Sequence, residues 1–197
     1  MRKFMFGLIS LTFFTLITGC ASSSPSRFYT LSPASVPVVT TGADYAVSVG
    51  PVVVPAMVDR PQIVLRAGPN RVFIDEFDRW ASPLRDNIQQ VVVENLVSML
   101  GTTRVTMFPK STAADASYRT LIEILRFDSE LGKEAALDAL WEVKAQKQEL
   151  SRRGRTILSE PVSGEDHEAL VAAHSRALAR LSADIAEAIR AFEKGTP

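Results

Sequence analysis

The first twenty residues constrain the rest of the chain most strongly. Arg2 and Lys3 precede an apolar run from Phe4 to Ile17, and small residues then lead to Cys20. A transmembrane helix needs about 20 predominantly apolar residues, and this run holds only about 14. An apolar region of that length, with cations before it and small residues after it, is typical of a signal peptide. Residues 1–19 are therefore predicted to be a signal peptide, and residues 20–197 to fold after export.

The end of this segment also predicts a covalent modification. Ile17-Thr18-Gly19-Cys20 resembles the bacterial lipobox, in which the cysteine becomes the first residue of the mature chain and carries acyl groups. Cys20 is the only cysteine, so an exported chain has no intramolecular disulfide to make. We favour lipidation of Cys20 over an incidental cysteine in an ordinary cleaved signal. Each buried methylene contributes about 0.8 kcal/mol, so several acyl chains would hold the protein firmly to a membrane.

The residue after the cysteine indicates which membrane would hold the lipidated chain. In the sorting rule of enteric bacteria, aspartate at this position retains a lipoprotein in the inner membrane. The chain has Ala21 there. By resemblance to that rule, we expect the protein to lie at the outer membrane, on its periplasmic face.

The charge balance excludes one class of function. The whole chain has 22 basic and 22 acidic residues, and the predicted signal peptide holds two of the bases and no acid, so the mature chain carries a formal net charge of −2. A nucleic-acid-binding domain would present a basic face, so we predict no nucleic-acid partner. The length suits a single domain, and no second long apolar run follows.

The region before the predicted domain has the composition of a tether. Residues 20–43 are rich in Ser, Thr and Pro and cannot bury enough apolar surface to order themselves. The domain is predicted to occupy residues 44–197. An apolar island from Phe28 to Leu31 interrupts the tether, and we expect it either to add an edge strand to the domain or to dock on a partner.

The remaining pattern predicts an α+β domain. Alternating or β-branched segments indicate strands, and those in the second half are joined by turn residues that suit an antiparallel meander. Two long segments have helical spacing of apolar residues. The predicted strands cover residues 46–55, 62–66, 71–75, 103–108, 117–128, 137–148 and 155–159, with a basic turn at 151–154; the helices run from 82 to 100 and from 163 onward. We expect an antiparallel sheet with two helices packed on one face.

The first helix has clear end signals and an unusually wide apolar surface. Ser82 is predicted to be its N-cap, with Pro83 in the first helical position, and Gly101 to end it. Val93 and Val97 widen the apolar stripe beyond one face. The sequence therefore predicts that more than one element covers this helix.

Few residues suggest chemistry. His167 and His174 are seven apart on one helix, whereas a helical metal site needs two ligands at i and i+4 with further donors. No Gly-x-Ser-x-Gly pentapeptide and no glycine-rich phosphate loop occurs. The acids of Asp75-Glu76-Phe77-Asp78 could form an acid/base pair, but such a run is more often a solvated turn. We therefore predict no catalytic residues, no metal site, no cofactor and no enzymatic activity.

Apolar residues in predicted loops suggest a contact surface instead. Phe77 and Trp80 lie just before the first helix, and the loop Asp59-Arg60-Pro61 precedes the predicted hairpin. Tryptophan before a helix often closes the end of a core, but interfaces are also enriched in aromatic residues and arginine. Our hypothesis is that Asp59, Arg60, Pro61, Phe77 and Trp80 bind a partner, with Trp80 close to the 59–61 loop at one end of the sheet.

An ordered set of motifs links the chain to a known family. It resembles the ABC-type transport auxiliary lipoproteins, the PqiC-like (YmbA) family, over nearly the whole mature chain. The motifs are the lipobox, residues 28–31, 49–55, 59–64, 79–84 and 94–96, Leu100-Gly101, Phe127-Asp128, residues 137–141, Ser163-Gly164 and residues 172–178. The resemblance implies a non-enzymatic outer-membrane lipoprotein that serves as an auxiliary or docking component of an MCE-type (PqiABC-like) lipid transport system and supports membrane integrity.

The same resemblance implies partners. They are an MCE-domain periplasmic protein, an inner-membrane permease component, the outer membrane itself through the lipid anchor, and possible further copies of the chain. The family has no catalytic residues to carry over, so Cys20 is the one chemically assigned site. Two alternatives stay open, a structural scaffold of the cell envelope and a periplasmic lipid-binding carrier. A carrier would need an apolar cavity, which the wide stripe of the first helix could line.

Overall fold

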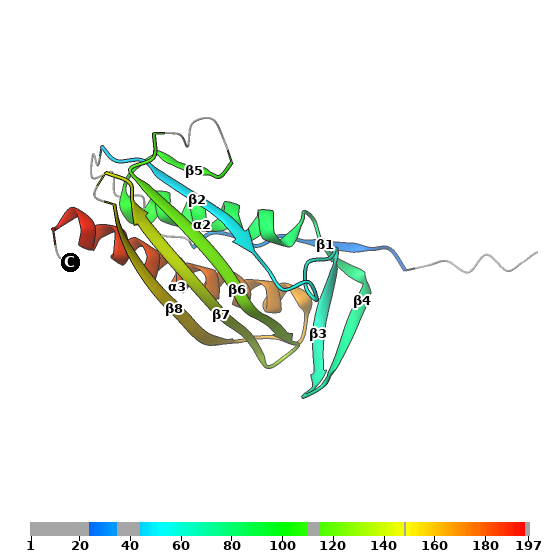
Figure 1. Cartoon of the computed structure of the whole chain (residues 1–197). Coiled ribbons are helices and arrows are strands. Elements are labelled where there is room, and N and C mark those ends of the chain that lie inside the picture. The colour runs from blue at the N-terminus through cyan, green and yellow to red at the C-terminus, as the bar shows by residue number, and fades with distance from the viewer. Residues whose placement is uncertain (1–23, 35–43, 110–114, 148, 196–197) are drawn as a thin grey trace, which may run out of the picture.

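The structure is a computed structural model that describes residues 24–34, 44–109, 115–147 and 149–195. Two long helices lie on one face of an eight-stranded sheet (Figure 1). The strands are β1 (Arg27–Tyr29), β2 (Val47–Val53), β3 (Gln62–Gly68), β4 (Arg71–Trp80), β5 (Val105–Met107), β6 (Tyr118–Glu130), β7 (Glu134–Ala145) and β8 (Leu150–Pro161), and the helices are α2 (Leu84–Leu100) and α3 (His167–Glu193). The α+β class and the two covering helices are thus confirmed.

Strand β6 pairs with three other strands of the sheet, β2, β3 and β7. On one side it pairs with β7, which pairs with β8, so these three strands form the expected antiparallel meander. On the other side β2 runs parallel to β6, and β5 runs parallel to β2. The sheet is therefore mixed rather than wholly antiparallel, because α2 carries the chain back across the sheet between β4 and β5, a connection that allows parallel pairing.

The β3–β4 hairpin branches from the far end of β6. Leu65 of β3 pairs with Ser129 in parallel, β4 folds back against β3, and β1 pairs in parallel with the end of β4. Strand β1 places the Phe28 island in the sheet, which is the first of the two alternatives that the sequence left open. It also explains why β4 continues to Trp80, where the sequence predicted a loop, since residues 78–80 gain a partner strand.

Both helix starts lie slightly later than predicted. Pro83, and not Ser82, is the N-cap of α2, because its ψ of 128° lies outside the helical range and its carbonyl accepts the amides of Asp86 and Asn87. Asp166 is the N-cap of α3, where its carboxylate accepts the amide of Ala169 at 2.8 Å. Gly101 ends α2, as predicted, and adopts the left-handed conformation.

Strand β8 is longer than the predicted 155–159 strand. The basic segment 151–154, predicted as a turn, lies inside it. Gly154 pairs with Trp141 of β7, and a Cβ on Gly154 would lie 2.1 Å from the indole ring. The glycine is therefore present to leave room for an indole, and not to turn the chain.

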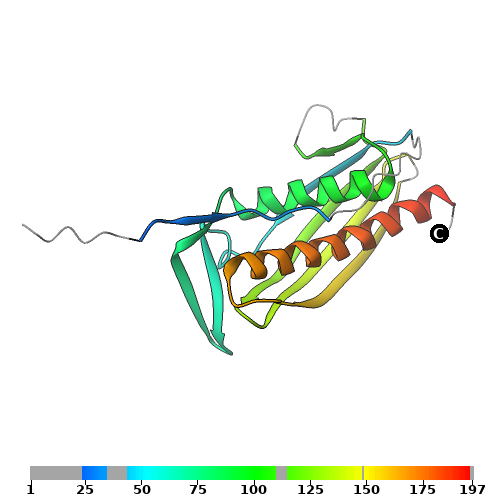
Figure 2. The same cartoon turned by 180° about the vertical axis from the view of Figure 1, so that it is seen from behind.

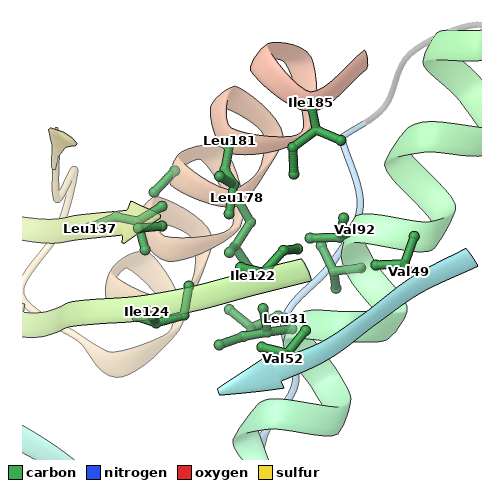
Figure 3. Packing of buried hydrophobic residues seen from close by; sticks show 14 of the residues in the cluster. Leu31, Val49, Val52, Val92, Ile122, Ile124, Leu137, Leu178, Leu181 and Ile185 are labelled. Atoms are coloured by element: carbon green, nitrogen blue, oxygen red, sulfur yellow. The ribbon is translucent and has the colours of Figure 1, made fainter. Parts of the chain in front are cut away.

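The core lies between the helices and the sheet. Figure 3 shows residues of α3, α2 and the sheet converging there, with Leu31 from the segment after β1 among them. Leu178, Leu181 and Ile185 of α3 are fully buried. The wide stripe of α2 packs against the sheet, α3 and the N-terminal segment, with Val93 and Val97 partly buried, so more than one element covers this helix, as expected. Within the described ranges, no helix is long and apolar enough to cross a membrane.

Candidate functional site

The N-terminal strand is fastened to the domain by one buried carboxylate. Arg27 donates to both oxygens of Asp78, from Nε at 2.7 Å and from Nη2 at 2.5 Å, and the Tyr29 hydroxyl donates to Oδ1 at 2.7 Å. These hydrogen bonds, led by that of Arg27, lower the pKa of Asp78 to about 2. Burial, followed by the bond to Asp78, raises the pKa of Tyr29 to about 12. The carboxylate is therefore ionised and the phenol neutral over the ordinary pH range.

The start of α3 closes this cluster. His167 is buried, with Nε2 3.3 Å from Asp75 Oδ2 and Nδ1 3.7 Å from Asp78 Oδ1, and its ring lies 5.7 Å from that of Tyr29. Ligand atoms of Asp75, Asp78 and His167 come within 4.8 Å of one another. Both oxygens of Asp78 are already engaged by Arg27 and Tyr29, which leaves too few free ligands for a closed metal site. We interpret the cluster as a clamp that joins β1, β4 and α3.

The segment that follows β1 runs between α2 and α3 (Figure 2). Polar side chains of both helices bind its backbone amides. Leu31 donates to Asn87 Oδ1 at 2.7 Å, and Ala34 donates to Asn95 Oδ1 at 2.8 Å. The amide of Ser32 donates to Ser175 Oγ on α3 at 3.1 Å. Residues 27–34, within the range predicted as tether, are thus built into the folded body; we call them the N-terminal strap.

The asparagines that bind the strap were not identified from the sequence. Asn87 and Asn95 are eight residues apart on α2, and both are buried. Asn95 also donates to Ser182 Oγ at 3.2 Å, which ties α2 to α3. The available signal was amide side chains at inward positions of a largely apolar helix, Gln89 included, since a buried amide needs partners. That pattern could have predicted that backbone crosses this helix.

A second histidine lies in the core. The His174 ring is completely buried and stacks on Phe127 with ring centroids 3.9 Å apart, and its Nε2 shares a 2.8 Å hydrogen bond with Ser129 Oγ. Burial lowers the pKa of His174 to about 3. Ser129 is itself only 3% exposed, so a substrate has no access to this pair. The serine and histidine therefore hold α3 against β6.

Of the predicted partner-binding residues, the 59–61 loop and Trp80 lie together at one end of the sheet. Trp80 donates its backbone amide to the carbonyl of Pro61 at 2.7 Å, and a depression of about 370 Å³ is lined by residues of the 59–61 loop and residues 80–85. Asp59, Arg60, Pro61 and Phe77 are exposed. The Trp80 side chain is only 5% exposed and meets Phe127 edge to face, so it supports this surface from the core.

Cys20 and the predicted signal peptide lie outside the described residues. The strap begins a few residues after that position, so the clamp around Asp78 is the first described connection between the predicted anchor and the domain. Fold and clamp together define a class of protein, a single α+β domain whose N-terminal segment is built into its helical face.

Residues 29–186 match the profile of the ABC-type transport auxiliary lipoprotein component family, and the chain belongs to this family. The chain is similar to a crystal structure of an uncharacterized protein, with 19% identity and a TM-score of 0.68 over 84% of this chain and 99% of that one. It is also similar to protein XCC0632 from Xanthomonas campestris, of family DUF330, with 16% identity and a TM-score of 0.70 over 87% of this chain and 100% of that one. These two structures support the fold. No curated protein matches.

Proposed function

We propose that the chain is a lipid-anchored, non-enzymatic docking component of an MCE-type lipid transport system, held at the periplasmic face of the outer membrane by acyl groups on Cys20. The match of residues 29–186 to the transport auxiliary lipoprotein family carries the proposal. The lipobox at residues 17–20 supports the anchor. The N-terminal strap supports it too, because a domain fastened directly after its anchor keeps a defined end toward the membrane.

The exposed residues around the 59–61 loop are the proposed contact for the MCE-domain protein. Arg60 and Phe77 offer a cation and an aromatic ring, residue types that interfaces favour. Asp59 lies 3.9 Å from Arg85 at the start of α2, so the loop rests against a helix end. A contact made on such a supported loop needs little ordering when the partner binds.

The test is recovery of the partner. The tagged full chain would be expressed with its MCE-domain protein, crosslinked mildly in cells and purified in detergent. Co-elution of the two proteins is expected, and Arg60→Glu should reduce the yield at least about fivefold, because it reverses the charge of a residue in the proposed contact. Arg180→Glu, an equal charge change on the exposed side of α3, is the matched control and should leave the yield unchanged.

Two results would count against the proposal. Failure to recover the MCE-domain protein, although it is expressed and the chain is lipidated, would overturn the docking function. Equal losses with Arg60→Glu and Arg180→Glu would overturn the assignment of the contact to the 59–61 loop while leaving docking in place.

A further inference from the structure

Exposed apolar side chains are concentrated at one end of the molecule. Among the described residues, twelve large hydrophobic side chains are exposed, and six of them lie on β1, on β4, in the loop that leads into β3 or in the β6–β7 turn. These six are Phe28, Met57, Val72, Phe73, Phe77 and Leu131, of which Phe77 belongs to the proposed partner contact. Figure 1 shows β1 and the β3–β4 hairpin at this same end. Such a concentration on a water-facing surface indicates a contact.

The position of the proposed anchor indicates that this surface contacts the bilayer. Cys20 precedes Arg27 by seven residues, and a fully extended chain spans at most about 3.6 Å per residue, so no more than about 25 Å separates the two Cα atoms. Arg27 is held to Asp78 by its two-point ion pair. The end of the domain that carries β1 must therefore stay close to the bilayer that receives the acyl chains.

The hairpin at this end has the chemistry of a membrane-contacting loop. Val72 is 38% exposed and Phe73 is 54% exposed, close to the tip of the hairpin. Arg71 is exposed beside them, whereas Arg66 is paired with Asp128 at 2.8 Å, and the first acidic residue of the hairpin is Asp75. Apolar side chains beside an exposed arginine suit the boundary between acyl chains and anionic headgroups.

We propose that the tip of the β3–β4 hairpin, with Phe73 at its centre, inserts into the headgroup region of the bilayer that holds the anchor, while Phe28 lies against the same surface. The inference rests on the proposed lipidation of Cys20. It gives the domain a fixed orientation, with the hairpin tip and the β6–β7 turn toward the membrane and the opposite end of the sheet, near Leu150, toward the periplasm. The hairpin and the anchor then act as two points of attachment.

The experiment measures the depth of a spin label in the full lipidated chain. Acylated Cys20 does not react, so a cysteine introduced by Phe73→Cys or Phe28→Cys would be the one site labelled. The matched control is Leu150→Cys, which is 51% exposed and pairs with Ala145 at the opposite end of the sheet. Each chain would be reconstituted into vesicles of phosphatidylethanolamine and phosphatidylglycerol, without any protein partner. The ratio of oxygen to water-soluble nickel accessibility should be at least about threefold higher at 73 and 28 than at 150.

The possible failures are distinguishable. Equal accessibility at 73 and 150, in a chain that floats with the vesicles, would overturn the hairpin contact alone. A chain that does not float would overturn the anchor together with the contact. Docking to the MCE-domain protein plays no part in either readout. Phe73 is half-exposed, so the labelled chain should fold, and Val72→Cys, at the neighbouring exposed position, must give the same depth if the tip inserts.

Discussion

Arg27 and Asp78, 51 residues apart in the sequence, form a two-point ion pair that fastens the first described strand to the end of the β3–β4 hairpin. Asp78 is 1% exposed, and Tyr29 and His167 approach the same carboxylate. A proposed anchor upstream of Arg27 would pull on the domain through this pair. The cluster that stabilises the fold therefore also connects the domain to its proposed anchor.

Replacing Asp78 should destabilise the domain. Asp78→Asn keeps an acceptor for Tyr29 but removes the charge that Arg27 needs, and should lower the free energy of unfolding by about 2 kcal/mol, the range for hydrogen bonds to a charged group. Urea unfolding would measure this. Asp44→Asn, which removes a 2.7 Å ion pair to Arg104 with Asp44 95% exposed, should change the free energy little. Equal effects of the two variants would contradict a special role for the buried carboxylate.

The pH dependence of the same pair has a definite sign. The pKa of Asp78 is about 2 in the folded chain, below its ordinary value of 3.8. Between these values the unfolded chain binds a proton that the folded chain does not, so this contribution to stability is complete above pH 4 and is lost as the pH falls toward 2. The difference in unfolding free energy between the parent chain and Asp78→Asn should shrink over that window. A difference that stays constant from pH 5 to pH 2 would refute the assignment.

His174 should make stability pH-dependent over a higher range. Its folded pKa of about 3 lies below the ordinary 6.5 because the ring is buried. Below pH 6.5 the unfolded chain takes up a proton that the buried ring does not, so stability falls with a slope of up to about 1.4 kcal/mol per pH unit toward pH 3. His174→Gln should remove this slope between pH 6 and pH 4.5. Parallel profiles for the two chains would show that His174 is protonated in the folded state.

Gly154 should not tolerate a side chain. A Cβ at this position would lie 2.1 Å from Cζ2 of Trp141, so Gly154→Ala forces the indole to move and should cost about 1–3 kcal/mol. Adding Trp141→Leu should recover part of the loss, because the ring that clashes is gone. Thermal unfolding of the single and double variants would measure both. Additive losses in the double variant would mean that the glycine is needed for its backbone instead.

Asn95 should control the order of the N-terminal strap. It is completely buried, accepts the amide of Ala34 and donates to Ser182. Asn95→Ala leaves that amide without its partner, which should cost about 1–3 kcal/mol and accelerate hydrogen exchange of Ala34. Gln90→Ala, an exposed amide on the same helix that bonds only Glu94 among the described residues, is the control. Unchanged hydrogen exchange at Ala34 in Asn95→Ala would show that Asn95 does not hold the strap in place.

The sequence predicted local structure better than it predicted long-range pairing. The meander, the hairpin and both helices follow from periodicity and turn residues. The position of β1 does not, because its pairing with residues 78–80 depends on a contact 51 residues away. The parallel pairing of β2 with β6 is likewise set by the crossover through α2, which local pattern does not encode. Trp80 shows the same limit, since the burial of its side chain against Phe127 depends on where β6 lies.

Membrane attachment through Cys20 is the most direct test of the account. The full chain and its Cys20→Ser variant would be expressed in cells that lack the native copy, then separated into membrane and soluble periplasmic fractions, with detergent sensitivity measured in parallel. We predict that the variant leaves the membrane fraction and that the cells become sensitive to detergent. A variant that still sediments with membranes, in cells whose barrier stays intact, would contradict the account.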